Sequence, residues 1–536
     1  MMRTLNGTRR LMGTAAAAAV CMAGAPALAQ QAGGTLRAQL FGNPPSLSIH
    51  EESTVATIFP MMPVMSNLVV YDQHEPQNSL ETIRPDLAES WSWNDDNTAV
   101  TFKLRQGVKW HDGAPFTAAD VKCTWDMLQG KSEARRLRRN PREIWYHNLK
   151  EVKVEDDFTV TFELGRPQPA FLALLASGQS PVYACHVPPA DMRTKPIGTG
   201  PFKLVTYRQN ERLVLEKNPD YFKKGLPYLD GIAYQIISSR STRHLAFIAG
   251  EHDITFPTDV TVPTLKDLKA QAPNAQCTQR LNNNASNILV NQEAPPFDNP
   301  DLRRALALTL DRDAFNEIIN EGQGGIGGAM LPPPSGQWGL PDEILKQIPG
   351  YGGDVEKNRD DARAIMEKLG YTENSPLKIK VITRNIASYR DPAVIFIDQL
   401  SKINIQAELE IIDSAVYYST ITAKRFTVAM NMTGSAVDDP DQHFYENYAC
   451  NSIRNYNGYC NKELETLFDR QSMEPDQQKR REIVWQIDRK LQEEVARPTL
   501  YHPVGIGCWH PQVQNYTVQI NSIYNGWRFE DLWLKR

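Results

Sequence analysis

The chain has 536 residues, of which 41% are hydrophobic and 23% are charged, so it is long enough to form two or three folded domains with sizeable cores. Its formal charge of −5 leaves no excess of Lys and Arg to neutralise phosphates. We therefore expect neither nucleic acid nor an anionic membrane surface as a partner.

The first 29 residues read as a secretory signal peptide. Two arginines at 9–10 precede the apolar run LMGTAAAAAVCMAGA, and Ala-Leu-Ala at 27–29 is an A-x-A cleavage site. The run is too short and too broken by Gly and Pro for a membrane anchor. Cys21 follows Val20, where a lipoprotein signal needs a small residue, so we expect no lipid anchor. The sequence predicts export to a Gram-negative periplasm, with cleavage near Ala29.

The first half of the mature chain has the alternating pattern of β-strands. Residues 90–108, SWSWNDDNTAVTFKLRQGV, and residues 152–164, VKVEDDFTVTFEL, each predict a hairpin around a turn of Asn and Asp residues. Between them, Thr117 and Asp120 have the spacing of a capping box and predict a helix start. Further strands are expected in FKLVTY, RLVLEKN and GIAYQII.

From about residue 285, strands and helices alternate. Asn299 and Pro300 predict one helix start, and Asn358 predicts another, whose helix stops at Gly370. LKIKVIT, a helix near PAVIFIDQLSKI, and IQAELEII form a strand-helix-strand unit, which implies parallel strands. A long amphipathic helix is expected at about 476–494.

The simplest architecture that fits these expected elements has two lobes and mixed α/β composition. We expect lobe I at 30–284, an inserted lobe II at 285–504, and a C-terminal return to lobe I at 505–536. Two crossings of the chain between the lobes would form a hinge.

Six cysteines follow the signal peptide, and export permits disulfides. Cys450 and Cys460 flank the short polar loop NSIRNYNGY, so we predict that they pair, with two free thiols as the alternative. Cys123 falls in the middle of a predicted helix and reads as a small core residue. The pairing of Cys123, Cys185, Cys277 and Cys508 stays open.

Several long blocks of this sequence resemble the family 5 extracytoplasmic solute-binding proteins, the cargo receptors of dipeptide, oligopeptide and nickel ABC importers. The blocks are RPDLAESWSWNDDNTAVTFKLRQGVKWHDGAPFTAADVKCTWDML at 84–127, IGTGPFKLVTYRQNERLVLEKNPDYF at 197–222 and DLRRALALTLDRDAF at 301–315. The resemblance implies an α/β periplasmic-binding-protein fold of type II, cluster C, with mixed sheets, an extra subdomain at about 75–195 and a ligand cleft between two lobes. It also implies capture by lobe closure without chemistry.

The resemblance places the family's ligand loop at residues 432–444, MTGSAVDDPDQHF. In dipeptide binders this loop reads Trp-Thr-Gly-Asp, and that Asp pairs with the peptide's amino group. Here Gly434 is followed by Ser435, and Met432 replaces the aromatic residue before Thr433, so the amine-binding carboxylate is missing from its expected place. We expect Met432, Thr433, Ser435 and Asp438 to face the ligand, with Asp438 as a substitute for the missing acid.

The acids of this loop have other interpretations. Asp439 before Pro440 can cap a helix, where Asp441 would favour the helix dipole. A metal site from Asp438, Asp441 and His443 is disfavoured, because no calcium-loop or zinc spacing is present. An exported hydrolase using Asp438 or Asp439 is the rival class, but neither G-x-S-x-G nor H-E-x-x-H occurs.

Two further segments could contact a ligand. TRNIASYRDP at 383–392 follows a predicted strand of the α/β lobe, where ligands gather, so Arg384, Tyr389 and Arg390 are candidates, with Arg able to bind a carboxylate. In lobe I, Glu52 and Ser53 follow the first strand, although a solvated loop explains them equally well. Tyr417, Tyr418, Phe444 and Tyr445 offer aromatic surface, though most should be core.

We interpret the chain as a monomeric, non-enzymatic solute-binding component of an ABC importer, with a small-molecule solute and an inner-membrane permease as partners and no cofactor or metal. Peptide is the default cargo of the family, but the altered loop favours another amino-acid-derived or aromatic compound. A ligand-sensing module without transport is the remaining alternative, because the same fold can serve it.

Overall fold

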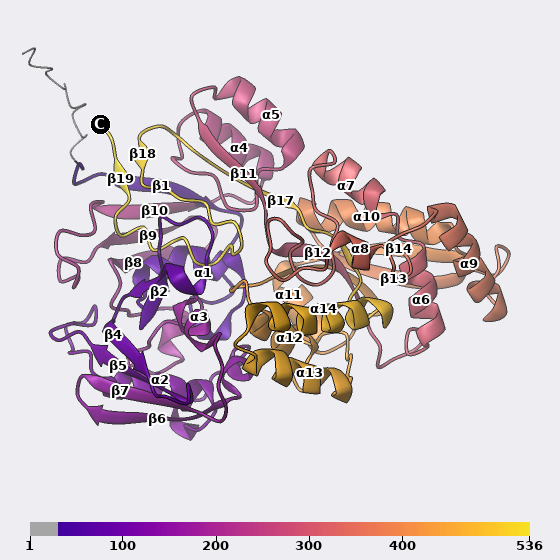
Figure 1. The fold of residues 1–536 in the computed structure, drawn as a ribbon. Helices are drawn as coiled ribbons and strands as arrows, with labels where there is room; N and C mark the ends of the chain where they lie inside the picture. The colour runs from indigo at the N-terminus through magenta and orange to yellow at the C-terminus, as the bar shows by residue number, and fades with distance from the viewer. Residues whose placement is uncertain (1–29) are drawn as a thin grey trace, which may run out of the picture.

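A computed structural model describes residues 30–536, and the predicted signal peptide lies outside the described residues. The chain folds into two lobes that lie side by side, with the N-terminal elements in one and the elements from β12 to α14 in the other (Figure 1). The C-terminal strands return to the first lobe, where β19 lies beside β1 (Figure 1).

The first lobe contains two four-stranded sheets. One has the order β1(Thr35–Leu40), β10(Gly231–Ile236), β9(Arg212–Lys217), β8(Phe202–Arg208), with β1 and β10 parallel. The other is antiparallel, in the order β4(Ala88–Trp93), β5(Ala99–Leu104), β7(Thr159–Leu164), β6(Leu149–Asp156). Smaller elements complete it: β2(Val69–Tyr71), β3(Ile83–Pro85), α1(Val55–Met61), α2(Ala118–Leu128), α3(Phe171–Ala176), α4(Arg240–Ile248) and α5(Val262–Gln271).

Local sequence signals account for much of this lobe. Both predicted hairpins are confirmed, as β4–β5 and β6–β7, because Asn and Asp side chains stabilise the turns between apolar alternating strands. The capping box is also confirmed: the Thr117 amide donates to Asp120 Oδ2 at 3.0 Å and starts α2.

The second lobe is built on a five-stranded mixed sheet. Its order is β14(Ile405–Ile412), β13(Leu377–Arg384), β15(Val428–Gly434), β12(Asn284–Val290), β16(Thr499–Tyr501), and β13 runs parallel to β14 as predicted. The helices are α6(Pro300–Leu308), α7(Arg312–Asn320), α8(Asp342–Leu345), α9(Val355–Lys368), α10(Ala387–Ser401), α11(Ser414–Thr422), α12(Pro440–Tyr448), α13(Lys462–Met473) and α14(Gln477–Glu493).

One predicted helix start is wrong, and another predicted helix begins earlier than its strongest signal. Helix α9 begins at Val355 instead of Asn358, because Asp354 caps it and accepts from the amides of Glu356 and Lys357. The helix expected near PAVIFIDQLSKI is confirmed as α10, which begins at Ala387, so Pro392 lies inside it. The proline was the strongest start signal in that segment, and the turn of helix before it carries no capping side chain.

The chain passes between the lobes next to a pair of antiparallel strands, β11(Gln276–Leu281) and β17(Val504–Trp509). Cys277 lies opposite Cys508 in this pair, and the two form a disulfide. After β17, the tail reaches β18(Val513–Gln514) and β19(Trp533–Leu534), and the Arg536 amide donates to Gln31 Oε1 at 2.8 Å. The residue limits expected for each lobe stay a prediction.

The six cysteines of the described chain form three disulfides. Cys450 pairs with Cys460, the pair that the short loop between them suggests, and Cys123 pairs with Cys185. The interpretation of Cys123 as a simple core residue is therefore wrong. The Cys123–Cys185 bridge spans 62 residues, and only the packing of α2 against the segment that follows α3 brings these two cysteines together.

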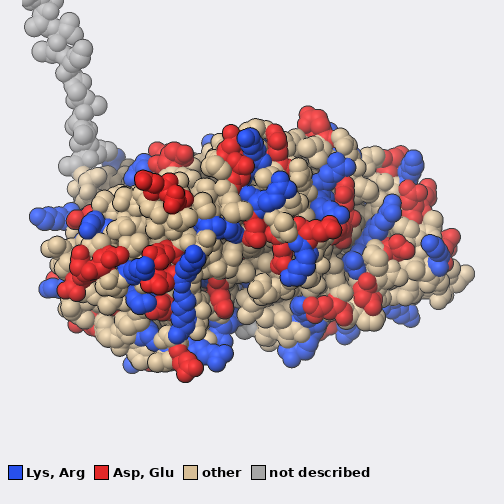
Figure 2. Space-filling view, turned by 60° about the horizontal axis from the view of Figure 1, so that its bottom comes forward, with Lys and Arg blue, Asp and Glu red and all other residues tan. Residues whose placement is uncertain are grey.

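On the face shown in Figure 2, basic and acidic side chains alternate and neither sign forms a continuous field. This distribution fits the small net charge of the chain. Within residues 30–536, no helix combines the length and apolar character that crossing a membrane requires.

Candidate functional site

The predicted ligand loop leads from β15 to α12 and lies where the two lobes meet. Ala436 and Val437 of this loop are buried in the hydrophobic core of the first lobe, although β15 and α12 belong to the second. Ser522 Oγ in the C-terminal tail donates to the Ala436 carbonyl at 2.9 Å. The loop therefore ties the second lobe to the first.

Asp439 and Asp441 hold the start of α12. Asp439 caps the helix through a 2.9 Å bond from the Asp441 amide, as the sequence indicated, and it also takes two bonds from the Arg480 guanidinium, at 2.6 and 2.9 Å. Asp441 accepts from Gln471 Nε2 at 2.6 Å and from Gln168 Nε2 of the first lobe at 2.9 Å. Both carboxylates are buried and occupied by protein partners.

Asp438 is the least engaged acid of the loop. Its carboxylate accepts from Asn521 Nδ2 at 3.0 Å, and its carbonyl accepts from Trp338 Nε1 at 3.1 Å. Burial, helped by the nearby Asp439 charge, raises the pKa of Asp438 to about 7, although the hydrogen bond from Asn521 opposes this shift. Near neutral pH it is therefore only partly ionised, a weak counter-charge for a ligand amine.

The other loop candidates are largely occupied. Ser435 Oγ lies 2.8 Å from His443 Nδ1, and burial lowers the pKa of that histidine to about 3. Thr433 Oγ1 accepts from Asn287 Nδ2 at 2.8 Å and from Arg497 at 3.1 Å, while Met432 is partly buried on β15. No group of three or more metal-ligating side chains occurs among the described residues.

Arg384 ends β13 and enters a buried aromatic group. Its guanidinium donates to Ser414 Oγ at 3.0 Å and to the Tyr418 hydroxyl at 3.3 Å, and it lies 4.8 Å from the ring centroid of Tyr389. Tyr417 packs edge-on to both tyrosines. Arg390 is not part of this group, because its side chain is 44% exposed and pairs with Asp391.

Glu52 is buried and Ser53 is partly buried beside an arginine-rich segment of the first lobe, so neither lies in a fully solvated loop. Glu52 forms salt bridges with Arg138 and Arg139. Arg142, which has no exposed surface, donates to Ser53 Oγ at 2.8 Å and to the Glu52 carbonyl at 2.6 Å.

The two lobes meet at Glu446 on α12, which the sequence analysis did not single out. Glu446 accepts from Trp145 Nε1 of the first lobe at 2.7 Å and forms a salt bridge with Arg454. Helix α12 also packs against the short helix η5(Glu143–Tyr146) that carries this tryptophan. The arginine-rich run RRLRRNPREIW at 135–145 was the sequence signal that could have pointed to this contact. Its partner Glu446 lies 301 positions away from Trp145, so no local pattern connects the two.

These groups form one network across the lobes. Burial raises the pKa of Tyr524 to about 12. That pKa also responds to the nearby side chains of Arg454, Tyr418, Glu446 and Arg142. Tyr524 in the C-terminal tail donates to the Ser53 carbonyl at 3.3 Å. We define the interlobe cluster by its members, which are Glu52, Ser53, Arg139, Arg142, Arg384, Tyr389, Tyr418, Glu446, Arg454 and Tyr524.

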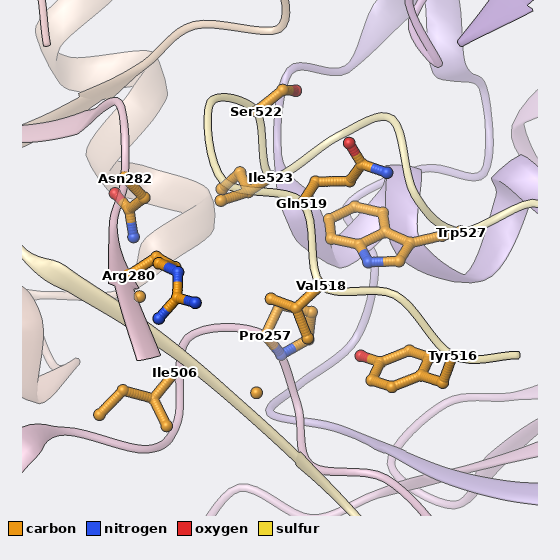
Figure 3. Close-up of a pocket in the computed structure, with 12 residues that line it drawn as sticks. Pro257, Arg280, Asn282, Ile506, Tyr516, Val518, Gln519, Ser522, Ile523 and Trp527 are labelled. Carbon is orange, nitrogen blue, oxygen red and sulfur yellow. The ribbon is translucent and has the colours of Figure 1, made fainter. Parts of the chain in front are cut away.

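A pocket beside β11 and β17, the strands next to which the chain crosses between the lobes and which we call the hinge strands, is distinct from this cluster. Arg280, Tyr516, Val518, Gln519 and Trp527 line it, beside strands β11 and β17 (Figure 3). It encloses about 30 Å³, which is room for a water molecule or two and too little for an organic solute.

Two α/β lobes that the chain connects twice, with buried charged side chains from both lobes at their contact, define a bilobal ligand-binding protein. The profile described as "Bacterial extracellular solute-binding proteins, family 5 Middle" matches residues 82–455. The chain belongs to family 5 of the bacterial extracellular solute-binding proteins.

Known relatives agree with this assignment. The chain is 28% identical over 455 residues to the "Di/tripeptide-binding protein 1" of Pseudomonas aeruginosa, covering 79% of this chain and 82% of the relative. It is similar in fold to the periplasmic binding protein DppA of Helicobacter pylori in complex with the peptide STSA, with a TM-score of 0.83 and 22% identity over 94% of this chain and 99% of the other. AgaA of A.tumefacien R10 in complex with agropinic acid gives a TM-score of 0.80 at 23% identity, over 94% and 99%.

Proposed function

We propose that this protein is the periplasmic solute-binding component of an ABC importer, which captures a small amphiphilic solute by lobe closure and delivers it unchanged to an inner-membrane permease. The observation that carries the proposal is the interlobe cluster, in which buried arginines and tyrosines come from both lobes. A ligand that contacts both lobes stabilises the closed arrangement over an open one, and that difference is what a permease can recognise.

The acids of the ligand loop support binding without chemistry. Asp439 and Asp441 are held by Arg480, Gln471 and Gln168, so they lack the free geometry that a general acid or base needs. The relatives named above are described as binding proteins, which is consistent with this role.

The solute is an amino-acid-derived compound in this proposal. Arg384, with its bidentate donor geometry, takes a carboxylate of the solute, and Tyr389 and Tyr418 cover its apolar part. The peptide-binding name of a relative makes a peptide the reference compound against which other solutes are compared. The fold does not choose among them, because its structural neighbours hold a peptide in one case and agropinic acid in another.

Scattering and mass spectrometry test the proposal together. Mature protein purified from a periplasm should release a small molecule on denaturation, detected by native mass spectrometry before and after. Stripped protein should show a smaller radius of gyration when that molecule is returned, and the molecule should be recovered chemically unchanged. Identical scattering profiles with and without a bound solute, or turnover of the solute, would rule the proposal out.

A further inference from the structure

The interlobe cluster carries more positive charge than its own carboxylates balance. Glu446 is shared between the Arg454 guanidinium and the Trp145 indole, and Glu52 is shared between Arg138 and Arg139. Among the described residues, no salt bridge joins Arg142 or Arg384 to a carboxylate. Both side chains are nonetheless buried, at 0% and 5% exposed.

Buried charge without a counter-charge is costly, since transfer out of water removes hydration that only a partner can replace. Burial lowers the pKa of Arg142 to about 10, and the nearby Arg454 charge lowers it too, although Glu446 opposes both. The Nε atoms of Arg142 and Arg454 are buried and lack a hydrogen-bond partner within the part of the chain that the structure describes. The cluster is therefore short of anionic acceptors.

The acids nearby do not supply them. Asp439 and Asp441 are engaged with Arg480, and Asp438 bonds to Asn521, so the loop brings no free carboxylate to the arginines. The same engagement leaves no free acid of this loop for a ligand amine. The arginines lie on both sides of the contact, since Arg142 and Arg139 belong to the first lobe and Arg384 and Arg454 to the second.

We infer that the solute is an acidic, amino-acid-derived compound with at least two carboxylates and no free amine that the protein must clamp. One carboxylate binds Arg384 among the tyrosines, and the other binds at the Arg142–Arg454 side of the cluster. The inference rests on the proposed function, because it names the solute that the lobes enclose. It also gives closure an electrostatic drive, since a dianion placed between the lobes attracts arginines of both.

A matched set of probes tests the charge preference. N-acetyl-tyrosyl-glutamate carries two carboxylates and no amine, N-acetyl-tyrosyl-glutamine carries one carboxylate, and tyrosyl-glutamine adds a free amine. With protein stripped of solute, calorimetry should give a Kd at least about tenfold lower for the first than for either of the others, the gain typical of one charge-assisted contact. Equal or tighter binding of tyrosyl-glutamine would overturn the inference.

Variants locate the two anion positions. Arg384→Gln and Arg142→Gln should each reduce the preference for the dicarboxylate at least about fivefold. Arg390→Gln, an exposed position on α10 whose side chain pairs with Asp391, should leave it unchanged. If Arg142→Gln does not fold, Arg142→Lys keeps the charge and should retain the preference. The assignment is contradicted if Arg384→Gln and Arg142→Gln both keep the wild-type preference for the dicarboxylate.

The natural solute gives an independent measurement. Methyl esterification of the molecule released from purified protein adds one methyl group per carboxylate, so mass spectrometry counts the carboxylates. Two or more support the inference, and one or none overturns it. Scattering separates this failure from failure of the proposed function. If a zwitterionic peptide closes the lobes, the proposed function stands and the charge preference fails. If neither the released molecule nor any probe closes the lobes, both fail.

Discussion

Asp438 shows how one residue can link the site to pH. Because its pKa is raised to about 7 by burial and by Asp439, the folded protein keeps a proton that the unfolded chain releases near pH 4. The stabilisation from this proton is complete below about pH 4 and is lost as the pH rises through about 7.

We predict that Asp438→Asn removes this pH dependence. The amide stays neutral and can still bond to Asn521, so the variant should gain stability relative to the wild type as the pH rises from 5 to 8, on the order of 2 kcal/mol. Urea unfolding at both pH values measures the difference. Asp391→Asn, an exposed substitution on α10, serves as the control, and a wild-type-to-variant difference that does not change with pH would contradict the assignment.

The individual acids of the loop were only partly predictable. The helix cap at Asp439 followed from the Asp-Pro pair, because a proline at the first helical position and an acceptor before it are local signals. The partner Arg480 lies 41 positions away on α14, and nothing local indicates the pair. Whether Asp438, Ser435, Thr433 and Met432 contact a solute stays a prediction.

At the scale of elements, the hinge strands β11 and β17 offer a direct test of stability. The Cys277–Cys508 bridge closes a sequence separation of 231 residues, whereas Cys450–Cys460 closes one of 10. In the chain-entropy view, a longer closed loop restricts the unfolded state more, by about 5 kcal/mol against about 3 kcal/mol here.

We predict that the Cys277→Ser, Cys508→Ser double variant loses more stability than Cys450→Ser, Cys460→Ser. The expected cost is about 2–5 kcal/mol for the hinge pair and less for the short loop, measured as the shift in urea midpoint at equal slope. Equal losses would indicate that native contacts, and not the unfolded chain, dominate the effect of these bridges. Wild-type protein with all disulfides reduced gives the lower limit.

Elements were predicted best where turn and cap chemistry is local. The hairpins β4–β5 and β6–β7, the start of α2 and the parallel pair β13–β14 all follow from short sequence patterns. The start of α10 was missed because its N-cap position, Ile386, provides no side-chain bond. Because α10 begins at Ala387, Tyr389 and Arg390 lie in its first turn, where Tyr389 points inward and Arg390 points to solvent.

At the scale of the molecule, the two-lobed fold was predictable and the composition of the interlobe cluster was not. Alternation of strands and helices after residue 285 and two crossings of the chain are features of the sequence pattern. Arg142 and Tyr524 of the first lobe meet the Glu446–Arg454 pair of the second lobe only where the lobes touch, and these residues come from three separate segments. Sequence periodicity carries no information on such contacts.

Contacts at the edge of the lobe interface should tune closure without touching the interlobe cluster. Arg166 of the first lobe donates to Asp469 Oδ1 at 2.7 Å, to Ser472 Oγ at 3.0 Å and to the Tyr445 hydroxyl at 2.9 Å, all in the second lobe. These bonds join the two lobes, so under the proposed closure they stabilise the closed form and not the open one. A solute that binds the closed form has its apparent affinity reduced by any fall in the closed population.

We predict that Arg166→Ala weakens solute binding about three- to tenfold, which corresponds to the loss of one partly exposed, charge-assisted group of bonds. At saturating solute, its scattering profile should match that of the wild type, because the solute still closes the lobes. Arg208→Ala is the matched control, since Arg208 pairs with Glu211 inside the first lobe. If Arg166→Ala binds as tightly as the control, closure is not part of the binding equilibrium; if it fails to close when saturated, Arg166 is required for the closed form itself.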